Sequence, residues 1–187
     1  MMVGAILTQA TQWRNVEQAI AQLEQAKVLS PERLVALPRT HLQQLIRPSG
    51  YFRQKAKRLS ALTSWYLRRY QGRPARMFRT PWPTLRRELL SLDGIGPETA
   101  DSILLYAGHL PVFVVDAYTI RVLHRHFLIG SNSTYDTVQQ RMMRTLPRDA
   151  QLYNEFHALL VAVGKRFCHR HDPDCAHCPL GDLPHTR

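Results

Sequence analysis

The stretch "LDGIGPETADSILLYA", residues 92–107, decides how this chain folds. Pro97 suits the first turn of a helix, because its missing N–H would have no intrahelical partner there. The segment before it also has helical spacing of its apolar residues, so residues 84–109 are predicted to form a helix, a tight hairpin and a second helix. Gly94 and Gly96 permit the tight connection, since glycine adopts positive φ readily and adds no side-chain bulk.

The hairpin has two possible roles. If the N–H groups of Gly94, Ile95 and Gly96 point outward together with the start of the second helix, they form a phosphate-binding turn. The alternative is a plain helical turn whose glycines serve close packing. The charge of the surrounding sequence favours phosphate binding.

That charge is strongly positive and unevenly spread. The chain has 25 Lys and Arg against 14 Asp and Glu, and between Arg33 and Arg87 there are 14 basic residues and no acidic one. Aromatic residues are interleaved with these charges, a combination typical of surfaces that bind a polyanion and stack on bases. A solvated helix face or an anionic membrane surface would give similar charge, but we expect a nucleic-acid partner.

Hydrophobic spacing is helical almost throughout, which predicts an all-α protein. The only plausible strand, Val112–Val115, is too short to build a sheet. With 187 residues and 44% apolar composition, the chain is long enough for one domain or two small packed lobes. The predicted helices cover residues 3–11, 15–27, 31–37, 40–47, 51–71, 84–92, 97–109, 116–127, 134–144 and 149–165.

No apolar stretch approaches the roughly 20 residues that span a bilayer, so we expect no membrane association. The start of the chain lacks a basic n-region and a small-residue cleavage site, which predicts a cytoplasmic protein. We also expect a bacterial-type, nucleoid-associated protein that is a monomer. The first helix begins at Val3 without a capping residue, so we expect an upstream helix to be missing.

A single aspartate follows the apolar run in "VFVVDAYTIRV", residues 112–122. Asp116 stands directly before a predicted helix, where a carboxylate caps the first free N–H groups. A fixed carboxylate at the end of a buried segment also suits a catalytic site. The two roles do not exclude each other.

Together these two stretches resemble the helix-hairpin-helix and aspartate signature of the DNA glycosylase superfamily that includes endonuclease III. Three further segments resemble the same family in the family's order. "MMVGAILTQATQWRNVEQAI" resembles its early helix with a glutamine that probes the duplex, and "NEFHALLVAVGKRFC" the helix before its cysteine loop. "IRPSGYFRQKAKRL" resembles its 3-methyladenine glycosylase branch.

The resemblance implies a two-lobed helical, endonuclease III-like fold that works as one functional domain. Residues 1–110 would form a six-helix-barrel-like lobe containing the hairpin motif at 84–109. Residues 111–187 would form a second helical lobe with the catalytic aspartate and a degenerate cysteine loop at 168–187. Double-stranded DNA and the flipped base would be held between the lobes.

The implied activity is excision of a damaged base, which must leave the stacked duplex before its bond to the sugar can be reached. Asp116 would stabilise the oxocarbenium character of the sugar, and it would steer or deprotonate the attacking water. Gln9 would fill the space left by the base. The residues implied to hold the DNA backbone are Gly94, Ile95, Gly96, Lys55, Lys57 and Arg58.

At one position the chain departs from the bifunctional members, which carry a lysine in the hairpin's second helix for a Schiff base with the sugar. This chain has Glu98 there. We therefore expect a monofunctional glycosylase that uses water as nucleophile, because a carboxylate cannot form an imine.

Glu98 resembles the alkyl-purine branch, whose cationic bases are good leaving groups and are favoured by aromatic walls. The candidate pocket residues are Trp13, Tyr51, Phe52 and Glu98, although each aromatic residue also suits a hydrophobic core. An endonuclease III-like glycosylase with lyase activity on oxidised or mismatched bases remains an alternative, as does a non-catalytic DNA-binding module.

The tail "CHRHDPDCAHCPLGDLPHTR" places Cys168, Cys175 and Cys178 at the first three positions of the family's [4Fe-4S] loop. The fourth cysteine would stand at residue 184, which is proline. Three interpretations stay open: a cluster with His185 as its fourth ligand, a zinc site, or a loop that has lost its metal.

Overall fold

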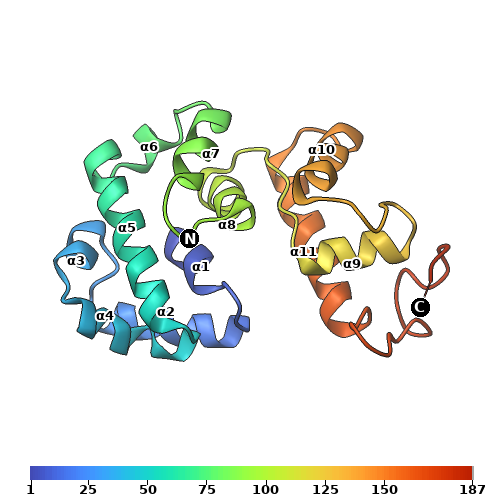
Figure 1. The fold of residues 1–187 in the computed structure, drawn as a ribbon, viewed down its shortest axis with the longest axis horizontal. Coiled ribbons are helices and arrows are strands. Elements are labelled where there is room, and N and C mark those ends of the chain that lie inside the picture. Colours follow the sequence, from blue (N-terminus) through green and yellow to red (C-terminus); the bar gives the residue numbers. More distant parts are fainter. Residues whose placement is uncertain (187) are drawn as a thin grey trace. The chain divides into compact units, whose positions relative to one another are not determined.

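The computed structural model describes residues 1–186, and within that part of the chain all regular structure is helical. The predicted all-α class is therefore confirmed. The described chain divides into two compact units, Met1–Gly108 and a second that begins at His109 (Figure 1). No helix within residues 1–186 is long and apolar enough to cross a membrane.

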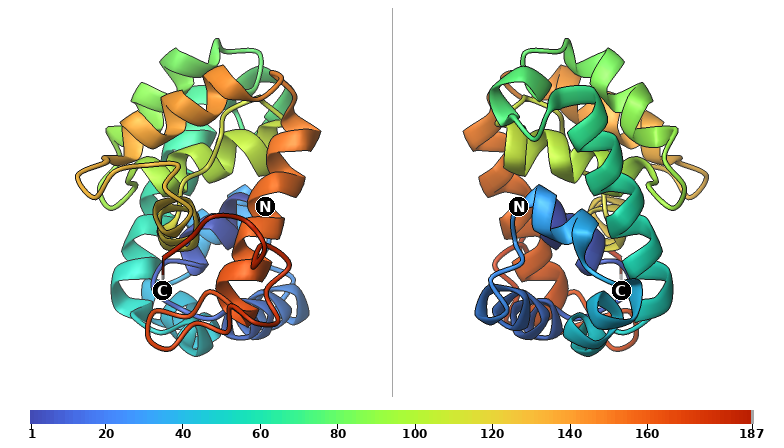
Figure 2. Two further views of the ribbon diagram at one scale, coloured as in Figure 1. Left: turned by 90° about the vertical axis from the view of Figure 1, so that its right-hand side faces the viewer. Right: turned by 90° about the vertical axis from the view of Figure 1, so that its left-hand side faces the viewer.

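The first unit is built around its longest helix, α5. In chain order its helices are α1 (Met2–Leu7), α2 (Trp13–Gln25), α3 (Pro31–Ala36), α4 (Arg39–Leu45), η1 (Arg47–Ser49), α5 (Phe52–Tyr70), α6 (Pro74–Met77), α7 (Trp82–Leu90), α8 (Pro97–Ser102) and η2 (Ile103–Ala107). Helix α5 packs against α1, α3, α4 and α6. The right panel of Figure 2 shows this helix most clearly. Its buried residues recur at every third or fourth position, so one face of α5 supplies much of the core.

One helix end and one short helix differ from the prediction. The first helix ends at Leu7, not at residue 11, because the Thr8 hydroxyl bonds to Gly4 O and Ala10 takes a left-handed conformation with φ of 50°. Gln9 is therefore on a loop and not on a helix. Helix α6 was not predicted, since four residues are too few to display a period.

The predicted helix over residues 97–109 is two segments, α8 and the wider π turn η2. Single π turns are often found at functional sites, and this one buries Ile103, Leu104 and Leu105. A paired contact joins α7 to α8: Arg86 Nε and Nη2 donate to Asp101 Oδ1 and Oδ2 at 2.8 and 3.1 Å. Asp101 is 0% exposed, so this ion pair fixes the hairpin's two arms to each other.

The second unit contains α9 (Ala117–Arg125), α10 (Tyr135–Thr145) and α11 (Ala150–Arg166). Helices α9 and α11 approach closely because Gly164 has no side chain: a Cβ atom there would lie 2.5 Å from Cδ1 of the Tyr118 ring. Residues 112–115 form a buried, non-helical segment before α9, and Gln139 Nε2 donates to Phe113 O at 2.6 Å. The left panel of Figure 2 shows α11 leading into the C-terminal loop.

Candidate functional site

The turn between α7 and α8 depends on one glycine more than on the other. Gly94 has φ of 78°, and a Cβ atom there would overlap the Arg58 side chain, so only glycine fits. Gly96 has an extended backbone, and a Cβ atom there would meet open space. Ile95 is buried and anchors the turn. Gly96 is exposed and has no side chain, so its backbone is uncovered on the outer side of the turn.

Two neighbouring residues of α5 contact the hairpin segment. Lys57 Nζ lies 2.6 Å from Asp93 Oδ2, and the hydrogen bond and charge of this ammonium lower the pKa of Asp93. Both side chains are exposed, so the ion pair adds little stability. Arg58 Nη1 donates to Gln9 Oε1 at 2.6 Å. The structure thus gathers Gln9, Arg58 and the hairpin, which are far apart in the sequence.

Lys55 differs from its expected role. It is 1% exposed, and its Nζ donates to Leu7 O at 2.8 Å and to Ser49 O at 2.6 Å. Burial, followed by the nearby Arg58 charge, lowers the pKa of Lys55 to about 8. A side chain in this position cannot contact a phosphate, so the expectation that Lys55 binds DNA is corrected: it joins three internal segments.

Asp116 is the N-cap of α9 and has a partner for each carboxylate oxygen. Oδ1 accepts a hydrogen bond from Thr119 N at 2.7 Å, and Oδ2 lies 3.6 Å from His157 Nε2. Its side chain is 13% exposed. Burial alone would raise the pKa of Asp116, but the neighbouring His157 ring and the hydrogen bond from the Thr119 N–H outweigh it and lower the pKa below the ordinary value. The carboxylate is therefore ionised near neutral pH.

His157 is the functional candidate that the sequence analysis did not identify. It lies on α11 with Tyr153, Leu160 and Gly164, at spacings of four, three and four, and all are buried. That spacing marks a single buried helix face. A histidine on such a face needs a polar partner, and this requirement was the available signal.

The four predicted pocket residues are exposed or half-buried in the first unit. Trp13 is 49% exposed and its Nε1 donates to Glu17, while Tyr51 is 67% exposed. Glu98 is exposed on α8, and Phe52 is half-buried. A cavity of this unit opens elsewhere, beside α1 and α2, and is lined mainly by apolar residues. The pocket assignment stays a prediction.

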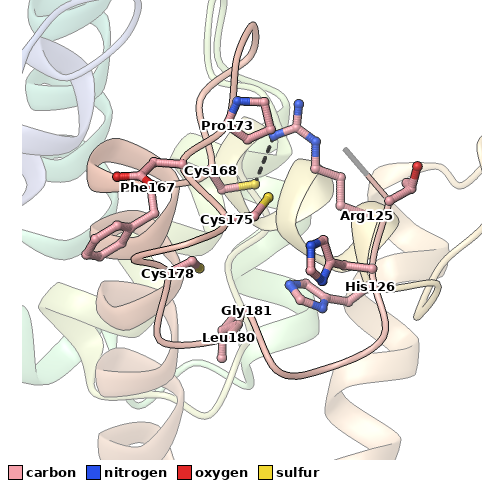
Figure 3. Close-up of a pocket in the computed structure, with 12 residues that line it drawn as sticks. Arg125, His126, Phe167, Cys168, Pro173, Cys175, Cys178, Leu180 and Gly181 are labelled. Atoms are coloured by element: carbon pink, nitrogen blue, oxygen red, sulfur yellow. Dashed lines mark hydrogen bonds between the residues drawn. The ribbon is translucent and has the colours of Figure 1, made fainter.

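The cysteine loop at the end of the chain is held by Arg125 of α9 (Figure 3) and by Arg121 of the same helix. Arg125 donates to Cys168 Sγ at 3.1 Å, to His169 O at 2.6 Å and to Arg170 O at 3.2 Å. Arg121 donates to Cys168 O at 2.6 Å. These bonds fix the first cysteine to the end of α9.

The chain has no fourth cysteine for a four-thiolate cluster, and the three interpretations of the loop stay predictions. No group of three or more His, Cys, Asp or Glu within residues 1–186 is arranged to hold a metal ion. Cys168 contacts a guanidinium, and a Cβ atom at Gly181 would press on the carbonyls of Cys175 and Cys178. His185, the alternative fourth ligand, has Nδ1 bonded to Leu183 O at 2.8 Å.

Comparison with known proteins agrees with this arrangement. Residues 3–148 match the sequence model of the HhH-GPD superfamily, described as base excision DNA repair proteins. Because this match covers most of the chain, the protein belongs to that family.

Three relatives illustrate the range of the family. A protein of Methanocaldococcus jannaschii with the provisional name of DNA repair glycosylase is 43% identical over 185 residues, which cover 98% of this chain and 83% of the relative. An endonuclease III in a non-covalent DNA complex matches with a TM-score of 0.82 and 25% identity over 98% of this chain and 80% of its own. The 3-methyladenine DNA glycosylase of Helicobacter pylori, bound to 1,N6-ethenoadenine, matches with a TM-score of 0.76 and 30% identity over 88% and 83% of the two chains.

Family membership confirms the class expected from the motifs. The fold is endonuclease III-like with a helix-hairpin-helix motif, and at the level of its family the protein is a DNA glycosylase of base excision repair. The relatives differ in their named activities, so the choice of base and the way the bond is broken have to be argued from the residues of this chain.

Proposed function

We propose that this protein removes a damaged base, most readily an alkylated purine, from double-stranded DNA by hydrolysis of the N-glycosidic bond. Water is the nucleophile, and the product is an abasic site. The observation that carries the proposal is Asp116, an ionised carboxylate with one oxygen fixed by a backbone N–H and the other beside His157.

Asp116 acts on the sugar. As the bond to the base breaks, the deoxyribose gains positive charge, and a fixed carboxylate beside the anomeric carbon stabilises that charge. The Thr119 N–H holds Oδ1, so Oδ2 is the oxygen that remains for the sugar or the attacking water. His157 lies beside Oδ2 at 3.6 Å and helps to keep it charged. The same carboxylate orients the water.

The lysines support a hydrolytic and not an imine mechanism. Only four are present, at residues 27, 55, 57 and 165, and Glu98 stands where the bifunctional enzymes carry theirs. Lys55 has the lowered pKa that an amine nucleophile needs, but it is buried and bonded to two carbonyls. An amine held in this way cannot attack a sugar.

The preference for an alkylated purine is supported by Glu98 and by the likeness to the Helicobacter pylori enzyme, which is bound to an adenine derivative. A cationic base is already a good leaving group, so the site needs no strong acid to protonate it. The exposed rings of Trp13 and Tyr51 are suited to stack on such a base.

DNA is held by its backbone in this proposal. The N–H groups of Gly94 and Gly96 and the exposed Lys57 face phosphates, while Gln9 enters the duplex. The likeness to an endonuclease III–DNA complex supports this part. The enzyme acts as a monomer on chromosomal DNA in the cytoplasm.

The test is a substrate panel. Purified protein is incubated with duplexes containing 3-methyladenine, 1,N6-ethenoadenine, uracil, a thymine mismatch or an oxidised pyrimidine, and the free base is measured by chromatography. We expect release of an alkylated purine and no covalent adduct with borohydride. Release of oxidised or mismatched bases with an adduct would favour the endonuclease III-like alternative. Binding without release of any base would leave only a DNA-binding module.

A further inference from the structure

Gln9 is held in place although it lies on a loop. Its Nε2 donates to Gly94 O at 3.1 Å and to Thr99 Oγ1 at 2.8 Å, and its Oε1 accepts from Arg58 Nη1 at 2.6 Å. Both ends of the amide are thus engaged, by the hairpin on one side and by α5 on the other. A glutamine on a free loop would sample many rotamers.

Arg58 contacts the hairpin as well as Gln9. Its side chain passes so close to Gly94 that a Cβ atom on that residue would overlap it. The positive φ of 78° at Gly94 and the absence of a side chain therefore serve one purpose, which is to admit Arg58. The guanidinium is half-buried at this position and points toward Gln9, not freely into solvent.

Lys55 fixes the backbone of the same segment. It lies three residues before Arg58 on α5, and its ammonium bonds to Leu7 O, the last residue of α1. Residues three apart on a helix lie on neighbouring positions of one face. One face of α5 thus holds both the backbone before Gln9 and the Gln9 side chain.

We propose that Arg58 and Thr99 are positioning residues, which hold Gln9 against the hairpin so that the probing amide and the phosphate-binding turn are presented to DNA as one preassembled unit. This inference rests on the proposed function, in which Gln9 enters the duplex. It gives Arg58 a different task from direct phosphate binding.

The network of Arg58 and Thr99 lowers the conformational entropy that Gln9 loses when DNA binds. Ordering a glutamine side chain is costly enough to shift an equilibrium by about tenfold, and the network orders it before DNA arrives. Loss of either anchor should therefore weaken opening of the duplex by about tenfold, while the number of phosphate contacts stays the same.

The experiment measures base unstacking without chemistry. A duplex carries 2-aminopurine beside a tetrahydrofuran abasic analogue, and its fluorescence is titrated with wild type, Arg58→Ala and Thr99→Val at several salt concentrations. Thr99→Ser keeps the hydroxyl and is the matched control for the buried site. Arg53→Ala removes one exposed charge from α5 and controls for net charge. Thermal melts show that each variant is folded, and the Gln9 side-chain amide is followed by NMR in the free protein.

We expect Arg58→Ala and Thr99→Val to weaken unstacking alike, with an unchanged salt slope, faster exchange of the Gln9 amide and effects that do not add in the double variant. Thr99→Ser should behave as wild type. If Thr99→Val behaves as wild type while Arg58→Ala lowers the salt slope by about one phosphate, Arg58 is a phosphate ligand and the proposal is wrong. Unstacking by a wild type that releases no base would leave this inference standing while the proposed activity fails. A wild type that does not unstack the duplex would overturn it.

Discussion

Two aspartates of this chain, the buried Asp101 on α8 and the half-buried Asp116 at the start of α9, have different surroundings. Both oxygens of Asp101 are taken by the Arg86 guanidinium, and the side chain is 0% exposed. Asp116 has one oxygen on a backbone N–H and the other 3.6 Å from a histidine, with 13% of the side chain exposed. The Asp101 carboxylate is neutralised by a permanent cation, whereas the Asp116 carboxylate keeps its charge and is partly accessible to solvent.

Burial alone therefore does not distinguish a carboxylate that joins helices from one that can take part in a reaction. A buried carboxylate matched by arginine serves to join two helices, because its charge is already balanced. A buried carboxylate that is kept ionised by hydrogen bonds retains a charge to offer to a reacting group. The comparison predicts that Asp101 is needed for the fold and Asp116 for activity.

Replacing Asp116 by Asn should have the largest effect, on activity only. Asparagine caps a helix as well as aspartate does, so the melting temperature should change little. Base release should fall by about 10²–10³-fold, because the developing charge on the sugar loses its counter-charge. Single-turnover release with matched binding to an abasic-analogue duplex measures both. A variant with wild-type release would remove the proposed mechanism.

Replacing Asp101 by Asn should act on the fold. It leaves Arg86 without its carboxylate at a mostly buried position, and we expect a loss of about 3 kcal/mol in the free energy of unfolding. Urea denaturation measures it, and Asp136→Asn at an exposed helix start is the comparison for loss of one acidic side chain. The rate of base release by the remaining folded protein should stay near that of wild type. A stable but inactive Asp101 variant would reverse the roles assigned to the two aspartates.

Replacing His157 by Ala should lower base release by about tenfold at neutral pH and change its pH profile. In wild type the lowered pKa of Asp116 means that its contribution to stability and activity is present above about pH 4 and is lost as the pH falls through the lower folded-state value. Without His157, burial dominates, the pKa of Asp116 rises, and the acid limb of the profile moves to higher pH. His157→Asn, which can still donate a hydrogen bond, should restore part of the shift. An unmoved acid limb in His157→Ala would show that this histidine does not govern Asp116.

Replacing Arg125 by Ala should have the smallest effect, because its bonds to the cysteine loop lie near the surface. A loss of about 1 kcal/mol is expected from the hydrogen bonds to Cys168 and His169. Arg166→Ala, exposed at the end of α11, is the control. If a chelator lowers the stability of wild type by much more than the Arg125 substitution does, the loop depends on a bound metal and not mainly on these hydrogen bonds.

The helices and the hairpin were predictable because they depend on local spacing. Pro97 marks a helix start, and the apolar period in α5 and α11 continues over four turns or more. The π turn after α8 was not predictable in this way, because it differs from an α-helix only in hydrogen bonds that span five residues instead of four. The family signature placed Asp116 directly before a helix, and the structure has it as the N-cap of α9.

The partners of the charged residues could not be predicted. Lys55 was assigned to a phosphate surface because the charge of its segment is uniform, yet its spacing to Leu59 and Leu62 places it on the buried face of α5. His157 lies 41 positions after Asp116, and no local pattern joins them. The bonds of Gln9 link three segments of the first unit, which only the tertiary structure brings together.

Gly164 makes α9 and α11 sensitive to a single methyl group. Tyr118, two residues after Asp116, packs where a side chain at 164 would stand. Alanine there would act as a spacer that wedges the two helices apart, with His157 on one of them and Asp116 at the start of the other. The distance between His157 and Asp116 therefore depends on the absence of a Cβ atom at residue 164.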